Sequence, residues 1–134
     1  MPDDEPARGS DQAVELFMRD GVAMLDPAAS LRDAAERLQA AEVGLLAVGT
    51  VDAVMGVISE RDIVRCVALG MDLDATTVAT VETEDLKWAA MGSSVDDVAE
   101  EMMENYLRHM LVADDAGMLV GVVSMRDLLT AYLT

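Results

Sequence analysis

The sequence of 134 residues has few of the side chains that most catalytic and metal sites use. Cys66, His109 and Lys87 are the only residues of their types. A single cysteine excludes an internal disulfide and a cysteine-rich metal site, and it favours a reducing compartment. We therefore expect a cytoplasmic protein without a metal centre. A Ser-His-Asp set and a Gly-x-x-x-x-Gly-Lys-Ser/Thr phosphate loop are both missing, which argues against an enzyme.

Long apolar runs and aromatic side chains are also scarce. No apolar run approaches the roughly 20 residues that cross a bilayer, so we expect no membrane span. Residues 1–10 are polar and acidic, unlike a signal or transit peptide, and they predict a short disordered leader. Aromatic residues make up 3% of the chain, whereas it has eleven methionines. Methionine therefore either fills much of the core or lines a partner surface, and the first alternative is the one we expect.

Positive charge is the third scarcity, since 26 acidic residues face nine basic ones and the net charge is −17. A field of this sign repels DNA, RNA and anionic membranes, so these partners are not expected. Either solubility in a concentrated or salty cytoplasm or a basic protein partner explains the charge. The carboxylates scatter over predicted helix faces and do not converge on a catalytic centre. Many alanines and eight arginines hint at a GC-rich bacterial source.

What the sequence does contain is an internal repeat. Gly56-Val-Ile-Ser-Glu-Arg-Asp-Ile-Val64 recurs as Gly121-Val-Val-Ser-Met-Arg-Asp-Leu-Leu129, with five of nine positions identical. Upstream, Ser30 to Asp33 matches Ser94 to Asp97. A repeat of this length indicates two copies of one structural unit. We expect the first repeat over residues 11–72 and the second over residues 73–134.

Each repeat predicts the same order of elements: a short helical lead-in, a strand, a capped helix, a two-stranded hairpin and a closing helix. The helices must cover one face of a small sheet, which predicts an α+β fold of two βαββα units packed about a pseudo-twofold axis. The predicted segments are 13–18, 22–25, 45–48 and 54–58 with helices from Ser30 and Ser59, then 78–83, 86–89, 110–113 and 119–123 with helices from Ser94 and Ser124.

Apolar spacing within the helices predicts their buried faces. We expect Cys66 to be a small buried apolar residue of the first closing helix. The other side chains expected in the core are those of Leu31, Ala34, Ala35 and Leu38 in the helix from Ser30, of Val95, Val98, Ala99, Met102, Met103 and Tyr106 in the helix from Ser94, and of Ile63, Val64, Val67, Leu128, Leu129 and Tyr132 in the closing helices.

Serine and aspartate three residues apart are themselves a helix-start pattern, and all four main helices begin with it. The spacing alone is therefore no sign of a binding site. The closing helices differ because a strand with an early glycine, Gly56 or Gly121, runs directly into each of them. Glycine in a strand permits close approach of a backbone or a ligand, and the helix start offers N–H groups to an anion. Arg61, Arg65 and Arg126 are either solvated side chains or neutralise a phosphate there.

Two βαββα units that end in Gly-x-x-Ser-x-Arg-Asp and a helix resemble a tandem pair of CBS domains (named from cystathionine β-synthase), also called a Bateman module. The resemblance covers residues 11 to 134. It implies a stand-alone regulatory protein that binds AMP, ADP, ATP, S-adenosylmethionine or NAD in a cleft between the repeats. It also implies a homodimer.

The resemblance further implies roles for single residues. Asp62 and Asp127 would hold the ribose hydroxyls, and Ser59 and Ser124 would reach ribose or phosphate. Arg61 and Arg126 join them as candidate phosphate contacts. Lys87 is either a phosphate contact or a solvated edge residue, and Trp88 either stacks on a base or is a core residue. The adenine contacts are expected at Val22, Ala23, Met24, Lys87, Trp88, Leu46 and Met110.

These observations lead to a functional hypothesis. The chain is expected to be a non-enzymatic regulator without a cofactor. Binding of an adenosine-containing ligand, as in energy sensing, would shift its affinity for an unidentified protein partner. The alternative is a ligand-free structural dimer whose acidic surface recruits a partner.

Overall fold

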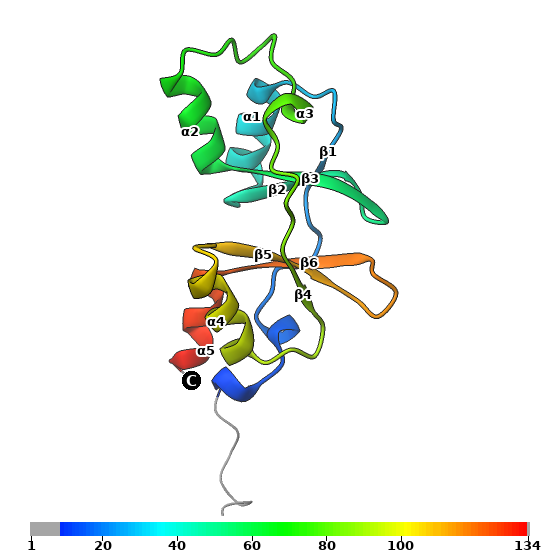
Figure 1. Cartoon of the computed structure of the whole chain (residues 1–134), viewed down its shortest axis with the longest axis vertical. Helices are drawn as coiled ribbons and strands as arrows, with labels where there is room; N and C mark the ends of the chain where they lie inside the picture. Colours follow the sequence, from blue (N-terminus) through cyan, green and yellow to red (C-terminus); the bar gives the residue numbers. More distant parts are fainter. Residues whose placement is uncertain (1–8, 134) are drawn as a thin grey trace, which may run out of the picture. The chain divides into compact units, whose positions relative to one another are not determined.

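The computed structural model describes residues 9–133 (Figure 1). It contains two three-stranded sheets with helices, which confirms the predicted α+β class. Of the predicted leader, residues 1–8 lie outside the described residues. Gly9 and Ser10, which the prediction also placed in the leader, instead form part of the 3-10 helix η2 (Gly9–Asp11) and are buried.

The predicted order of elements is present in both repeats. In each sheet the first strand pairs in parallel with the second, and the second pairs antiparallel with the third. The first repeat contains η3 (Val14–Leu16), β1 (Met24–Leu25), α1 (Leu31–Ala41), β2 (Leu45–Thr50), β3 (Ala53–Ser59) and α2 (Glu60–Ala68). The second contains α3 (Val78–Val81), β4 (Trp88–Ala90), α4 (Val95–Glu104), β5 (His109–Ala113), β6 (Leu119–Ser124) and α5 (Met125–Tyr132).

The two compact units of the structure do not coincide with the two sequence repeats. One unit is Val22–Leu86, and the other joins residues 9–21 to residues 87–133. Each lead-in thus packs with the elements of the other repeat. Arg19 forms a β-bridge with Val122, and Thr83 forms the equivalent bridge with Val57. The repeats therefore exchange their first segments.

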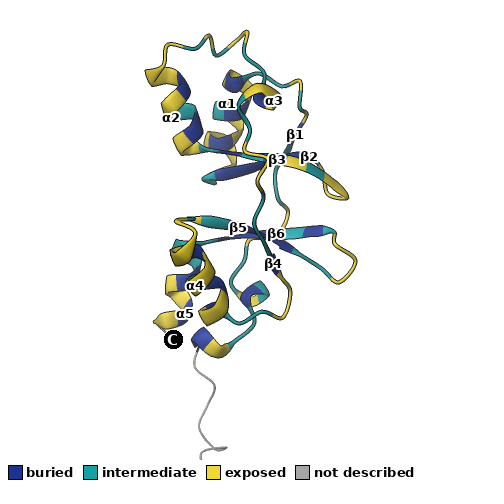
Figure 2. Ribbon diagram, in the orientation of Figure 1, coloured by how far each residue is buried: buried dark blue, intermediate teal, exposed yellow. Residues whose placement is uncertain are grey.

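Each unit has its own apolar core, and in each the helices cover one face of the sheet (Figure 2). Val14 of the N-terminal segment is fully buried in the core beneath β4–β6, and Val78 is fully buried in the other core. The expected methionine-filled core is wrong. Only Met102 and Met110 are buried among the described methionines, and the cores consist mainly of valine, leucine and alanine.

Several predicted core residues are exposed, because each helix buries only a narrow stripe against its sheet. In α2 the buried residues are Asp62 and Cys66, which confirms the expectation for Cys66, and in α5 they are Leu128 and Ala131. Helix α4 ends at Glu104, so Tyr106 lies beyond it with a positive φ of 56° and is 94% exposed. The predicted core residues that are instead exposed are Val64, Val67, Met103, Tyr106, Leu129 and Tyr132.

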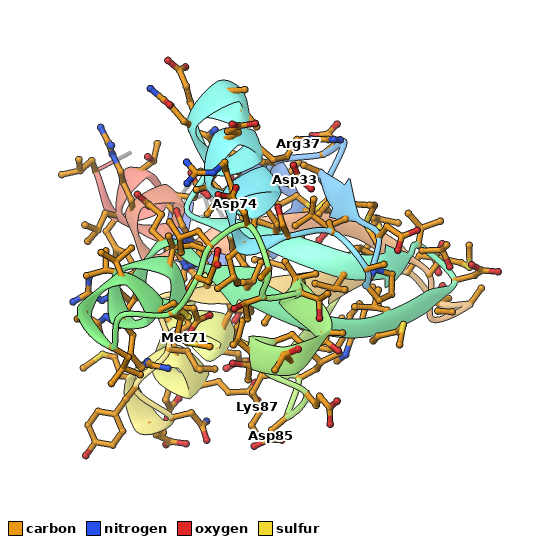
Figure 3. The ribbon with its side chains drawn as sticks, turned by 90° about the horizontal axis from the view of Figure 1, so that it is seen from above. Asp33, Arg37, Met71, Asp74, Asp85 and Lys87 are labelled. Carbon is orange, nitrogen blue, oxygen red and sulfur yellow. The ribbon has the colours of Figure 1, made fainter. Side chains whose placement is uncertain are left out.

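Polar contacts tie the helices to neighbouring segments within each unit. Arg32 of α1 forms an ion pair with Asp74, which lies beside α1 in Figure 3, and the pair lowers the pKa of Asp74. The Tyr132 hydroxyl of α5 donates to Asp96 Oδ1 of α4 at 2.6 Å, and this hydrogen bond raises the pKa of Tyr132 to about 12. Among residues 9–133, no helix has the length and apolar character needed to span a membrane.

Candidate functional site

All four predicted serine caps are present. In each case the backbone N–H of the aspartate three residues on donates to the serine Oγ, at 3.0 to 3.2 Å. The aspartate returns the bond to the serine N–H at Ser30, Ser59 and Ser124, but not at Ser94. Capping therefore accounts for Ser-x-x-Asp at helices with and without the glycine motif, as the sequence predicted.

The two motif aspartates differ in their partners. Asp62 Oδ2 accepts from the Ser59 N–H at 2.8 Å and is 3.0 Å from Ser59 Oγ, while Asp62 Oδ1 lies 3.4 Å from Arg65 Nη1. Asp127 Oδ2 accepts from the Ser124 N–H at 2.9 Å. Within residues 9–133 its Oδ1 has no hydrogen-bond partner, because Thr130 stands where the first repeat has Arg65. Asp127 thus keeps one carboxylate oxygen available to a ligand.

The start of each closing helix offers less backbone to an anion than the sequence indicated. In α2 the Glu60 N–H donates to the Gly44 carbonyl oxygen at 3.0 Å, and in α5 the Met125 N–H donates to the Arg108 carbonyl oxygen at 2.8 Å. The N–H groups of Asp62 and Asp127 are used by the caps. Within the described part of the chain, only the Arg61 and Arg126 N–H groups of the first turns lack a partner. An anion would meet one N–H in each unit.

The arginines near these helix starts are exposed. Arg61 and Arg126 occupy equivalent positions, and neither side chain forms a salt bridge within residues 9–133. Arg65 is paired with Asp62. The structure therefore leaves Arg61 and Arg126 able to reach a phosphate.

The structure brings the predicted adenine contacts into the units of the two motifs. Val22, Ala23, Met24 and Leu46 belong to the unit of Ser59, and Lys87, Trp88 and Met110 belong to the unit of Ser124. Ser59 lies opposite Leu45 in the sheet, and Ser124 lies opposite His109.

The side chains of these contact residues differ in exposure. Leu46 and Met110 are in the cores, with 0% and 1% of each residue exposed, so neither offers accessible surface to a ligand. Trp88 is partly exposed, and it belongs to neither core cluster. Lys87, which is labelled in Figure 3, directly precedes β4.

The motif glycines permit the close approach that the sequence predicted. A Cβ atom on Gly56 would lie 2.8 Å from Glu82 Cδ, and one on Gly121 would lie 2.8 Å from the Arg19 carbonyl oxygen and 2.5 Å from Met18 Sδ. Glu82 and Met18 were not predicted from the sequence, although they occupy equivalent positions of the lead-ins. The pattern that could have found them is the repeat offset of 64 residues, which relates Met18 to Glu82 as it relates Ser30 to Ser94.

Comparisons with known proteins agree with this geometry. The family model described as "CBS domain" matches residues 13–69 and 78–134. An uncharacterized 17.7 kDa protein of Acidianus ambivalens is 33% identical over 113 residues, which are 84% of this chain and 68% of the relative. The inosine-5'-monophosphate dehydrogenase of Nitrosopumilus maritimus is 27% identical over 100 residues, but the match spans only 20% of that enzyme.

Solved structures give the same result. A CBS domain protein from Pyrobaculum aerophilum, complexed with AMP, is 30% identical, with a TM-score of 0.77 over 95% of this chain and 98% of that chain. A CBS-domain containing protein from Agrobacterium tumefaciens is 27% identical, with a TM-score of 0.83 over 96% and 98% of the two chains.

Proposed function

Because this chain belongs to the CBS domain family, with two such domains in tandem, we propose that it is a regulatory protein that binds an adenosine-containing ligand. The observation that carries the proposal is the same arrangement in both units. At the start of one helix lie a motif aspartate that completes the cap, a backbone N–H that has no partner among residues 9–133, and an exposed arginine. The AMP complex of the Pyrobaculum aerophilum relative supports it.

The proposed roles follow from the donors and acceptors present. A carboxylate accepts hydrogen bonds and suits a vicinal diol, so Asp62 and Asp127 hold ribose hydroxyls. Arg61 and Arg126, each with its own backbone N–H, neutralise phosphate where the ligand has one. The ligand is expected between the two repeats, as the family resemblance implies. Its binding favours one packing of the repeats and so changes the affinity for a protein partner.

Equilibrium binding tests the proposal. Isothermal titration with AMP, ATP and S-adenosylmethionine should give saturable binding to the unmodified protein, and the Asp62→Ala, Asp127→Ala double variant should bind at least about tenfold more weakly. Asp33→Ala is the matched control, since Asp33 completes a capping box outside the glycine motif. No saturable binding, or equal binding by the double variant, would contradict the proposal.

The homodimer also belongs to the proposal. Val64, Val67 and Leu69 of the α2 region are 56% to 71% exposed, and Leu129 and Leu133 are exposed at α5. Burying such apolar side chains against a second copy is favourable. Sedimentation equilibrium should therefore give twice the mass of one chain, and Val64→Asp should lower that mass toward one chain.

The same exposed side chains favour a second candidate function, that of a ligand-free interaction dimer. This candidate predicts a dimer whose thermal unfolding is unchanged by millimolar nucleotide. The proposed regulator is instead stabilised by any ligand that binds the folded state. The dehydrogenase relative supports no catalytic role, because the match covers one fifth of that enzyme.

A further inference from the structure

The two units differ in the side chain that covers the motif glycine. Glu82 lies against Gly56 in the unit of Ser59, whereas Met18 lies against Gly121 in the unit of Ser124. One of the two equivalent positions is therefore a carboxylate and the other an uncharged thioether. Glu82 and Met18, which differ in charge, thus lie close to the strands that carry the two motifs.

Glu82 is unusual because one of its oxygens is buried without a partner. Oε2 accepts no hydrogen bond from residues 9–133, although the side chain as a whole is partly exposed. Burial raises the pKa of Glu82, and the charge of Glu84 adds to the effect. Buried polar atoms in native proteins nearly always have a donor or acceptor, so an orphan oxygen points to a group that arrives from outside the chain.

The Glu82 carboxylate follows α3 and lies against β3, the strand that leads to the candidate site. Thr83, the next residue, exchanges two backbone hydrogen bonds with Val57 at 3.0 and 2.9 Å. Ser59 is three residues after Gly56 in β3, which is about 10 Å along a strand. A ligand whose ribose is held by Asp62 can therefore extend along β3 toward Glu82.

We propose that Glu82 makes the Ser59–Asp62 half of the protein selective for the charge of its ligand. This half accepts adenosine compounds that present an uncharged or cationic hydrogen-bond donor and rejects those with phosphate groups. The Ser124–Asp127 half, with Met18 in the same place, accepts phosphorylated nucleotides. A phosphate beside the partly buried Glu82 carboxylate is repelled with little screening, whereas an amino or sulfonium group is attracted. Arg61 is exposed, so water and salt screen its attraction for the phosphate, and in this half it does not offset the repulsion by Glu82. The inference rests on the proposed function and assigns a ligand class to each half.

Single-half variants of the full chain test it. Asp127→Ala leaves the Ser59 half to bind, and Asp62→Ala leaves the Ser124 half. In the Asp127→Ala background, isothermal titration at pH 7.5 should show S-adenosylmethionine and adenosine binding at least about tenfold more tightly than AMP. Adding Glu82→Gln, which keeps the shape and removes the charge, should raise the AMP affinity about tenfold and weaken S-adenosylmethionine.

The reciprocal change is the matched control. In the Asp62→Ala background, Met18→Glu should lower the AMP affinity about tenfold. Circular dichroism and thermal unfolding confirm that each variant is folded, and Glu82→Met replaces Glu82→Gln if the amide variant unfolds. An AMP affinity that is the same with and without the Glu82→Gln change, while the protein binds AMP, overturns the inference alone. Absence of binding for every ligand to the unmodified protein overturns the proposed function and the inference together.

Discussion

At the scale of single residues, Glu82 departs furthest from what its surroundings favour. A carboxylate with a buried, unpartnered oxygen stands where the equivalent residue of the other unit is methionine. Removing such a group relieves an unsatisfied acceptor, so Glu82→Met should raise the free energy of unfolding at pH 7 by about 1 kcal/mol. Urea denaturation measures the change. Met18→Glu is the matched control and should destabilise the protein, and a destabilising Glu82→Met would contradict the structural account.

Glu82 also predicts a pH dependence. Because its folded-state pKa lies above the ordinary value of 4.5, the folded state binds more protons than the unfolded state between those two values. Stability attributable to Glu82 therefore falls as the pH rises through that window and is regained on acidification. The stability difference between Glu82→Met and the unmodified protein should accordingly shrink from pH 7 to pH 4.5. A difference that stays constant over this range would show that the charge of Glu82 is not its cause.

At the scale of elements, substitutions at the serine caps distinguish an effect on stability from an effect on ligand binding. Ser30→Ala, Ser59→Ala and Ser124→Ala each remove a side-chain acceptor from a helix start, so each should cost about 1 kcal/mol of stability. Only Ser59→Ala and Ser124→Ala should also weaken ligand binding, because Ser30 lies outside the glycine motif. Chemical denaturation and titration on the same preparations check both results. Equal loss of binding with Ser30→Ala would mean that the serines act through stability alone.

The elements also show how far the sequence could lead. The order of strands and helices and all four caps were predictable, since each depends on local spacing and residue type. The buried faces of α2 and α5 were not, because Val64 and Leu129 fit an apolar stripe as well as the residues that the sheet actually covers. The contact of Glu82 with Gly56 depends on tertiary packing, so no local pattern revealed it. The ion pair of Arg65 with Asp62 is instead an i,i+3 contact within α2, which the helical spacing permits.

At the scale of the whole molecule, the exchanged lead-ins couple distant parts of the sequence. Val14 is fully buried in the core beneath β4–β6, and Val78 is fully buried in the core beneath β1–β3. Each truncation to alanine should cost about 2 kcal/mol through the cavity it leaves. Native-state hydrogen exchange should show faster opening of α4 and α5 in Val14→Ala, and of α1 and α2 in Val78→Ala. Opening of the lead-in's own sequence repeat instead would contradict the exchange.

The charge of the whole chain leads to the last prediction. With a net charge of −17, carboxylates repel one another more in the compact state than in the extended chain. Salt reduces the Debye length from about 30 Å at 0.01 M to about 3 Å at 1 M, so it screens nearly all of this repulsion. Thermal unfolding should therefore shift upward between low and high sodium chloride.

Choline chloride should shift thermal unfolding as much as sodium chloride, since screening depends on ionic strength and not on the cation. A shift with sodium alone would indicate a cation bound to particular carboxylates. A melting temperature independent of both salts would mean that the acidic residues are too widely spaced to strain the fold, and would favour a basic partner as the reason for the charge.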